Sequence, residues 1–268
     1  MTDNRNLDKS IGADTVDKRI DIKELSLLPN LIEGLNLLKF DDEAVKFIEE
    51  DKYQEALYLL NRILKINKND FDVWYHKGEA LYYLQEHEES LLCFEYILKH
   101  TPADIDALFM KAIVLGDLGK HTQAIEVYEK ILESNPEDAD TIVNMSDELI
   151  QIGKYNEALD YLHPLIQSNP SDVDALINEG TALLKLEKIN KALFSFDNVL
   201  KHNNKDEEAW YMKARCLSLL NKKEQALDAV LVAISIAPSY KNKIKNETDF
   251  TNIKNLNRFK ELMESEIY

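Results

Sequence analysis

The sequence predicts an all-α protein built as a solenoid of antiparallel helix hairpins, and three observations lead to this fold class. Only 7 glycines and 6 prolines occur in 268 residues, where Leu, Ala, Glu and Lys are abundant, which favours helix over sheet. A phrase of the sequence recurs at a fixed interval of 34 residues. Within each copy, apolar residues follow the three-and-four spacing of two amphipathic helices.

The repeat is clearest between "GKHTQAIEVYEKILESNP" at 119–136 and "GKYNEALDYLHPLIQSNP" at 153–170. Extending this frame in both directions gives six gapless units: 37–70, 71–104, 105–138, 139–172, 173–206 and 207–240. A number from 1 to 34 within a unit is called its frame position below. Each unit is expected to form one helix hairpin with a short polar turn between its two helices.

Two frame positions contain only very small residues. Position 8 reads Ala44, Gly78, Ala112, Ser146, Gly180, Ala214, and position 20 reads Ala56, Ser90, Ala124, Ala158, Ala192, Ala226. Two helices approach to about 8–10 Å only where small side chains meet, so these columns mark the contact within each hairpin. One hairpin cannot bury its apolar face alone, and stacking of neighbouring units is expected to provide the stability.

Signals for helix ends recur in the same frame. Proline stands at position 32 in four of the six units, after the second helix, where it ends a helix without breaking one. Asp104, Asp138 and Asp172 precede the next first helix, where their side chains suit the N-cap.

The segments outside the frame are expected to cover the ends of the solenoid. Residues 1–20 are polar and predicted to be disordered, and 21–36 contain enough leucines for an N-terminal capping helix. Residues 241–268 are predicted to form a C-terminal capping helix, with Ile253, Leu256 and Phe259 on one face.

The repeat resembles the tetratricopeptide repeat (TPR), whose signature has Trp at position 4, Gly at 8, Phe at 24 and Pro at 32. Unit 71–104 carries these residues as Trp74, Gly78, Phe94 and Pro102. The resemblance implies a right-handed superhelix whose first helices line the concave surface at positions 2, 5, 6, 9, 12 and 13. It also implies a role in binding other proteins.

The charge of the chain disfavours some classes of partner. The net charge is −17 and falls almost entirely on 37–240, which disfavours broad binding to nucleic acid or to an anionic membrane. A neutral to basic protein partner is easier to accommodate. The chain shows no apolar run of bilayer length and no signal peptide, so a cytoplasmic location is expected. Cys93 and Cys216 are interpreted as small buried hydrophobes in a reducing compartment.

No catalytic or cofactor-binding motif was found in the sequence, which contains no P-loop, GxGxxG, HExxH, GxSxG or CxxC. His87 and His121 share frame position 17 and are expected to be neighbours, but no third ligand recurs there. We therefore expect no enzyme activity, no metal and no cofactor.

The candidate binding residues are those that the resemblance places in the concave groove. They are aromatic, apolar and acidic in the front units and amide-rich in the middle: Tyr75, His76, Glu79, Tyr82, Tyr83, Phe109, Met110, Ile113, Asn144, Asp147, Asn178 and Arg215. Exposed aromatics suit partner anchoring, although the same rings could finish the packing between units. A clamp for chaperone tails is not expected, because position 5 never holds the lysine that it needs.

The sequence supports three functional hypotheses. The first is a non-catalytic scaffold or adaptor that binds a partner peptide or helix in the groove. The second is a structural assembly subunit, a homo-oligomer that uses its convex face or an end of the solenoid. An enzyme or enzyme-accessory subunit is a remote third.

Overall fold

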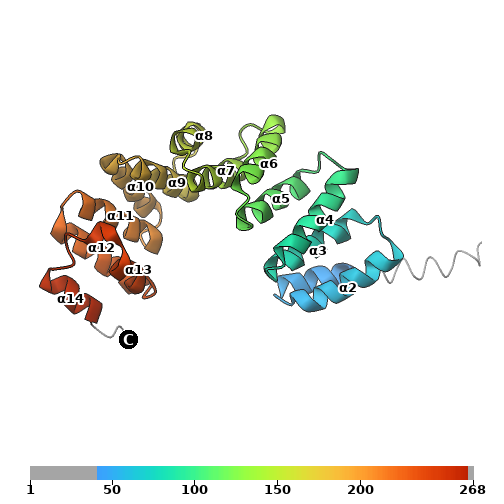
Figure 1. Cartoon of the computed structure of the whole chain (residues 1–268), viewed down its shortest axis with the longest axis horizontal. Helices are drawn as coiled ribbons and strands as arrows, with labels where there is room; N and C mark the ends of the chain where they lie inside the picture. The colour runs from blue at the N-terminus through green and yellow to red at the C-terminus, as the bar shows by residue number, and fades with distance from the viewer. Residues whose placement is uncertain (1–40, 265–268) are drawn as a thin grey trace, which may run out of the picture. The chain divides into compact units, whose positions relative to one another are not determined.

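A computed structural model describes residues 41–264, and throughout this range the regular structure is helical, without strands (Figure 1). The chain divides into two compact units, 1–69 and 70–268, which are described separately. The predictions for 1–20 and 21–36 fall outside the described residues. No helix within 41–264 has both the length and the hydrophobicity to cross a bilayer.

The first unit contains a helical stretch at 41–49 and α2 (Tyr53–Ile66). Ala44 and Ala56 are fully buried in it, as expected of the two small frame positions. Leu60 and Ile63 of α2 complete its buried side.

The second unit consists of five helix pairs followed by a C-terminal segment. The first helices of the pairs are α3 (Phe71–Tyr83), α5 (Ile105–Asp117), α7 (Ala139–Gln151), α9 (Val173–Lys185) and α11 (Glu207–Leu219). The second helices are α4 (His87–His100), α6 (His121–Ser134), α8 (Tyr155–Ser168), α10 (Ile189–His202) and α12 (Lys223–Ile236). From α3 to α12, each helix packs against the next one along the chain, and successive first helices also contact each other. The predicted all-α solenoid of helix hairpins is confirmed.

Aspartate caps begin the first helices. The carboxylates of Asp104, Asp138 and Asp172 each accept a hydrogen bond from the backbone N–H three residues later, at 2.9–3.0 Å, as predicted. Asp70 and Asp206 do the same for α3 and α11. Each such cap stabilises its helix by about 1 kcal/mol. The second helices have no side-chain cap and depend on the preceding turn.

That turn contains a residue with left-handed backbone conformation at frame position 15 in all six 34-residue repeats. The residues with positive φ are Asp51, Gln85, Gly119, Gly153, Glu187 and Asn221. In the repeat 105–138, the Gly119 N–H donates to the Gly116 carbonyl and the Lys120 N–H to the Leu115 carbonyl, both at 2.8 Å. These two bonds satisfy carbonyls at the end of the first helix and reverse the chain into the second.

The residues at frame positions 8 and 20 are buried in all five repeats between 71 and 240, which confirms the predicted contact within each hairpin. Ser90 fits at position 20 because its hydroxyl donates to the Gly78 carbonyl, at 2.7 Å. A Cβ at Gly78 would lie 2.7 Å from the Phe94 ring, so the glycine makes room for this ring. Gly180 and Phe196 repeat this pairing.

Pro164 lies inside α8, where it removes one backbone hydrogen bond from the helix interior. It is exposed, and the helix continues to Ser168. This proline departs from the rule that prolines of the repeat stand between helices.

The C-terminal segment packs on α11 and α12, but it is not the single helix that was predicted. It comprises α13 (Tyr240–Asn246), the 3-10 turn η1 (Thr248–Phe250) and α14 (Asn257–Glu264), and is called the cap below. Phe250 and Ile253 are fully buried in the turns between these helices. Hydrogen bonds of Asp249 and Asn252 with α11 hold this non-helical stretch in place. Such contacts between distant residues cannot be predicted from the spacing of apolar residues within the segment.

Candidate partner-binding face

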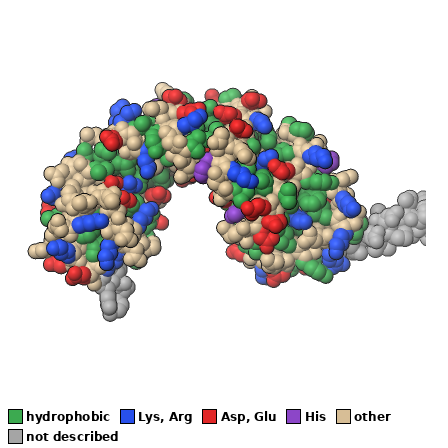
Figure 2. Space-filling model, in the orientation of Figure 1, with side chains coloured by type: hydrophobic (Ala, Val, Ile, Leu, Met, Phe, Trp, Pro, Cys, Tyr) green, Lys and Arg blue, Asp and Glu red, His purple; other side chains and the backbone are tan. Residues whose placement is uncertain are grey.

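The first helices α3, α5, α7, α9 and α11 contact one another in order and so line one surface of the second unit, called the inner face. The expected groove residues lie on these five helices. Figure 2 shows acidic side chains distributed over many helices, in keeping with a chain of net charge −17.

The tyrosines of α3 are partly buried and set among acids. Burial and then the negative charges of Glu79, Asp106 and Asp104 raise the pKa of Tyr75 to about 12. Burial and a hydrogen bond to Asp117 of α5 raise the pKa of Tyr82 to about 12. The ring of Tyr75 meets Phe94 edge-on with centroids 5.7 Å apart, so this tyrosine also contributes to packing. Tyr83 is 48% exposed.

Phe109, Met110 and Ile113 of α5 are half-buried. Phe109 meets the buried Tyr128 ring edge-on at 5.9 Å, and Met110 packs against the core beneath α3 and α5. These side chains therefore contribute to the packing and remain partly exposed on the inner face.

His76 and Glu79 place polar groups beside the aromatic rings. Burial raises the pKa of Glu79, and the neighbouring His76 opposes that rise. A carboxylate that is partly desolvated gains most from a cation brought next to it. This part of the face is suited to a basic group on a partner.

The amides in the middle of the inner face are already engaged within the protein. Asn144 donates to the Asp140 carbonyl of its own helix at 2.8 Å, and Asn178 of α9 donates to the Val143 carbonyl of α7 at 3.0 Å. Asp147 is exposed and accepts a bond from Gln151. Asn178 thus joins two repeats, and its side-chain oxygen remains as an acceptor.

Sequence reasoning missed a partly buried acid at the centre of this face. Nδ1 of His121 lies 2.6 Å from Oε2 of Glu148, whose side chain is 12% exposed. Burial raises the pKa of Glu148, and the hydrogen bond with His121 opposes it. A Cβ at Gly116 would overlap this carboxylate, so Gly116 makes room for it. The signal in the sequence was a glutamate at frame position 10, where four other units have Ala, Val or Cys.

Arg215 lies on the inner face but binds the cap. Its guanidinium lies 2.8 Å from Asp249 and 3.8 Å from Glu247, and it lines a pocket of about 520 Å³ with Leu184 and Leu219. The inner face near α11 is therefore covered by the chain itself.

The chemistry available to the described residues is limited. Within 41–264, no three His, Cys, Asp or Glu side chains are grouped so as to hold a metal ion. His87 contacts the Tyr82 ring, while His121 contacts Glu148. Cys93 and Cys216 are free and buried, as predicted, and burial raises their pKa values to about 11 and about 12.

Comparison with solved structures gives the same fold. A tetratricopeptide repeat protein from Parabacteroides merdae superposes with a TM-score of 0.66 at 18% identity, covering 88% of this chain and 94% of that one. YrrB, described as a TPR protein with an unusual peptide-binding site, gives 0.55 at 21% identity over 74% and 98% of the two chains. MamA from Desulfovibrio magneticus RS-1 gives 0.58 at 18% identity over 64% and 97%.

Sequence comparison identifies the repeats themselves. No curated protein matches the chain. Three tetratricopeptide repeat family models match it, one at 115–179 and 149–216, one at 75–139 and one at 207–240. With the hairpins, small columns and caps described above, these matches show that the chain belongs to the tetratricopeptide repeat family.

Proposed function

We propose that this protein is a non-catalytic scaffold that binds a peptide or helix of a partner protein on the front of its inner face, formed by α3 and α5. The observation that carries the proposal is the combination of half-buried aromatics on both helices with the partly desolvated Glu79 of α3 and the exposed Asp117 of α5. Tyrosine and phenylalanine provide large anchoring surfaces, and the acids select a basic neighbour.

The electrostatics support a neutral to basic partner with apolar anchors. Glu79 and Asp117 lie beside Tyr75 and Tyr82, so a lysine or arginine next to an apolar anchor would meet a carboxylate. Binding to such a surface weakens as salt rises, because the charges on both sides are screened.

The test begins with affinity capture and mass spectrometry to identify a partner, followed by titration of the purified pair. The variant Tyr75→Ala/Tyr82→Ala/Phe109→Ala is expected to weaken binding at least tenfold while circular dichroism still shows the helical fold. The control Leu92→Ala/Phe194→Ala removes exposed apolar side chains of the second helices, which are 64% and 63% exposed, and should bind normally. Equal binding by the triple variant and the wild type would refute the assignment.

Self-assembly is the competing function, and one feature favours it. Leu92 and Phe194 share frame position 22 on the outer side of second helices, where exposed apolar side chains could meet another copy. Light scattering of the Leu92→Ala/Phe194→Ala control decides between the two: a loss of oligomers in this variant would favour assembly.

A further inference from the structure

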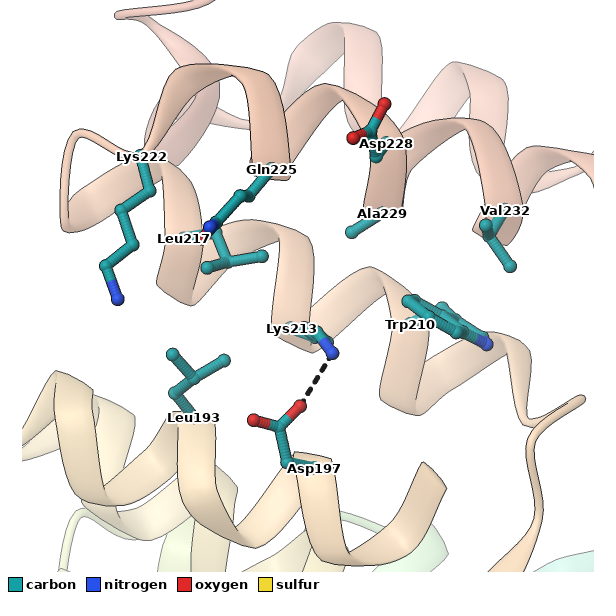
Figure 3. Close-up of a pocket in the computed structure, with 10 residues that line it drawn as sticks. All are labelled: Leu193, Asp197, Trp210, Lys213, Leu217, Lys222, Gln225, Asp228, Ala229 and Val232. Carbon is teal, nitrogen blue, oxygen red and sulfur yellow. Dashed lines mark ion pairs between the residues drawn. The ribbon is translucent and has the colours of Figure 1, made fainter. Parts of the chain in front are cut away.

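A second pocket lies away from the inner face, between the second helices α10 and α12, with α11 as its floor (Figure 3). Its volume is about 430 Å³, within the range of sites that hold a few side chains of a ligand. Half of its lining residues are apolar and half are polar or charged: Leu193, Asp197, Trp210, Lys213, Leu217, Lys222, Gln225, Asp228, Ala229 and Val232. It is called the outer pocket below.

Comparison with the repeat 71–104, which contains the other tryptophan, explains why this pocket is open. Trp74 and Trp210 share frame position 4, and a lysine ammonium lies over each ring, 5.1 Å and 4.9 Å from the centroids. At position 26, Tyr96 stacks against Trp74 with centroids 4.5 Å apart. The same position beside Trp210 is Val232, which is too short to cover the indole. The outer pocket is the space that Tyr96 fills in the repeat 71–104.

The charges around the outer pocket leave one cation uncompensated. Asp197 pairs with Lys213 at 2.7 Å, as Figure 3 shows, and Asp228 pairs with Arg258 at 2.7 Å. Lys222 also lines the pocket, and among the described residues no carboxylate lies within ion-pair distance of its ammonium. The four charged side chains that line the pocket, two aspartates and two lysines, therefore sum to zero, and among the described residues Lys222 is the one of the four that has no ion partner.

We propose that the outer pocket is a second binding site, which takes a short partner segment bearing an aromatic or branched apolar side chain next to a carboxylate. The apolar side chain occupies the space beside Trp210, Ala229 and Val232, and the carboxylate pairs with Lys222. This preference is opposite to that of the acidic inner face. The two sites therefore select different segments, and the outer pocket does not depend on the function proposed above.

Trp210 lines the pocket and can report binding directly. In a Trp74→Phe background it is the only tryptophan of the chain. The probes are two acetylated and amidated peptides, Ala-Glu-Phe-Glu-Ala and its lysine counterpart Ala-Lys-Phe-Lys-Ala. We expect the acidic peptide to change Trp210 fluorescence saturably, at a concentration at least tenfold lower than the lysine peptide. No saturable change with the acidic peptide, or equal curves for both, would overturn the proposal.

Two pairs of variants locate the site. Lys222→Glu should reverse the preference between the peptides, whereas the same charge change at its exposed neighbour in Lys223→Glu should keep it. Val232→Tyr should abolish the response by covering Trp210 as Tyr96 covers Trp74, whereas Leu231→Tyr should not. Unaltered binding to Lys222→Glu or to Val232→Tyr would show that the peptide binds elsewhere. The inner-face triple variant should respond as the wild type does, which separates this proposal from the first.

Discussion

Tyr75 of α3 and Tyr211 of α11 occupy the same frame position, yet Tyr211 is 1% exposed and Tyr75 is only half-buried. The difference lies in the element that covers each helix. The element over α3 is another repeat, whose helix α5 covers the tyrosine in part. The element over α11 is the cap, whose Glu247 accepts a hydrogen bond from Tyr211 and whose Phe250 packs near its ring. Equivalent residues are therefore fully buried under the cap in one repeat and only partly buried between repeats in the other.

Among the variants that test this comparison, substitution of Phe250 is expected to cause the largest loss of stability. It is fully buried, so Phe250→Ala should lower the free energy of unfolding by about 3–5 kcal/mol. Phe109→Ala, at a half-buried ring of the front face, should cost about 1–2 kcal/mol, because part of that ring is already in water. Urea denaturation measures both, and similar costs for the two would contradict the assignment of separate roles.

The ion pair of the cap comes next. Arg215 and Asp249 have side chains 18% and 21% exposed, so removing either partner leaves the other partly desolvated. Arg215→Ala should cost about 1–3 kcal/mol, and a double-mutant cycle with Asp249→Ala should show coupling. The more exposed pair of Lys111 and Glu95 in the front repeats should cost less than about 1 kcal/mol in the same measurement.

The two regions should also respond oppositely to pH. Burial raises the pKa of Glu247, but the hydrogen bond from Tyr211, the charge of Arg215 and backbone N–H groups outweigh it, so this pKa is lowered in the folded protein. Its stabilising contribution is present above the unfolded value of 4.5 and is lost as pH falls through the folded value. The pKa of Glu79 is raised by burial, so its contribution is present at low pH and is lost as pH rises above 4.5.

Two glutamine variants test this contrast. In unfolding titrations between about pH 3.5 and 7, Glu247→Gln should flatten the loss of stability on acidification, because the titrating group is gone. Glu79→Gln should instead gain stability relative to the wild type as pH rises. Identical pH profiles for the two variants would contradict the assigned signs.

The smallest effect is expected at the turn that both regions share. Gln85 lies in the turn after α3 and has a φ of 64°, a conformation that costs a residue with a Cβ about 1–2 kcal/mol. Gln85→Gly should therefore stabilise the protein by up to about 1 kcal/mol after the greater backbone entropy of glycine is subtracted. Asn221→Gly after α11 should gain less, because asparagine tolerates this conformation. Thermal melts compare the two, and Gln85→Ala controls for loss of the side chain.

The frame predicted much of the fold because the features that set it are local or repeated. Ala124 and Ala192 are fully buried, as the small columns required, and Asp104 caps α5, as its place before the helix indicated. The left-handed position could also have been found, because Gly119 and Gly153 mark its column. In the other units, unfavourable residues such as Glu187 hid the signal.

The candidate site was harder to predict, because residues from different repeats decide its chemistry. Asn178 was expected to bind a peptide, but it donates to the backbone of the preceding repeat. The position of Glu148 depends on a missing Cβ at Gly116, one repeat earlier. Neither contact can be predicted from the 34-residue repeat pattern, because each one joins residues of two different repeats.

By itself, the sequence determined that this chain forms stacked helix hairpins, because a 34-residue period of small, large and capping residues specifies each hairpin and its neighbour. Only the tertiary structure decided which surface residues remain available. Arg215 and Tyr211 bind the cap, and the short Val232 leaves part of Trp210 lining the outer pocket. The physical reason is that burial and pairing depend on atoms that meet across helices, and a one-dimensional pattern fixes only which side of its own helix a residue occupies.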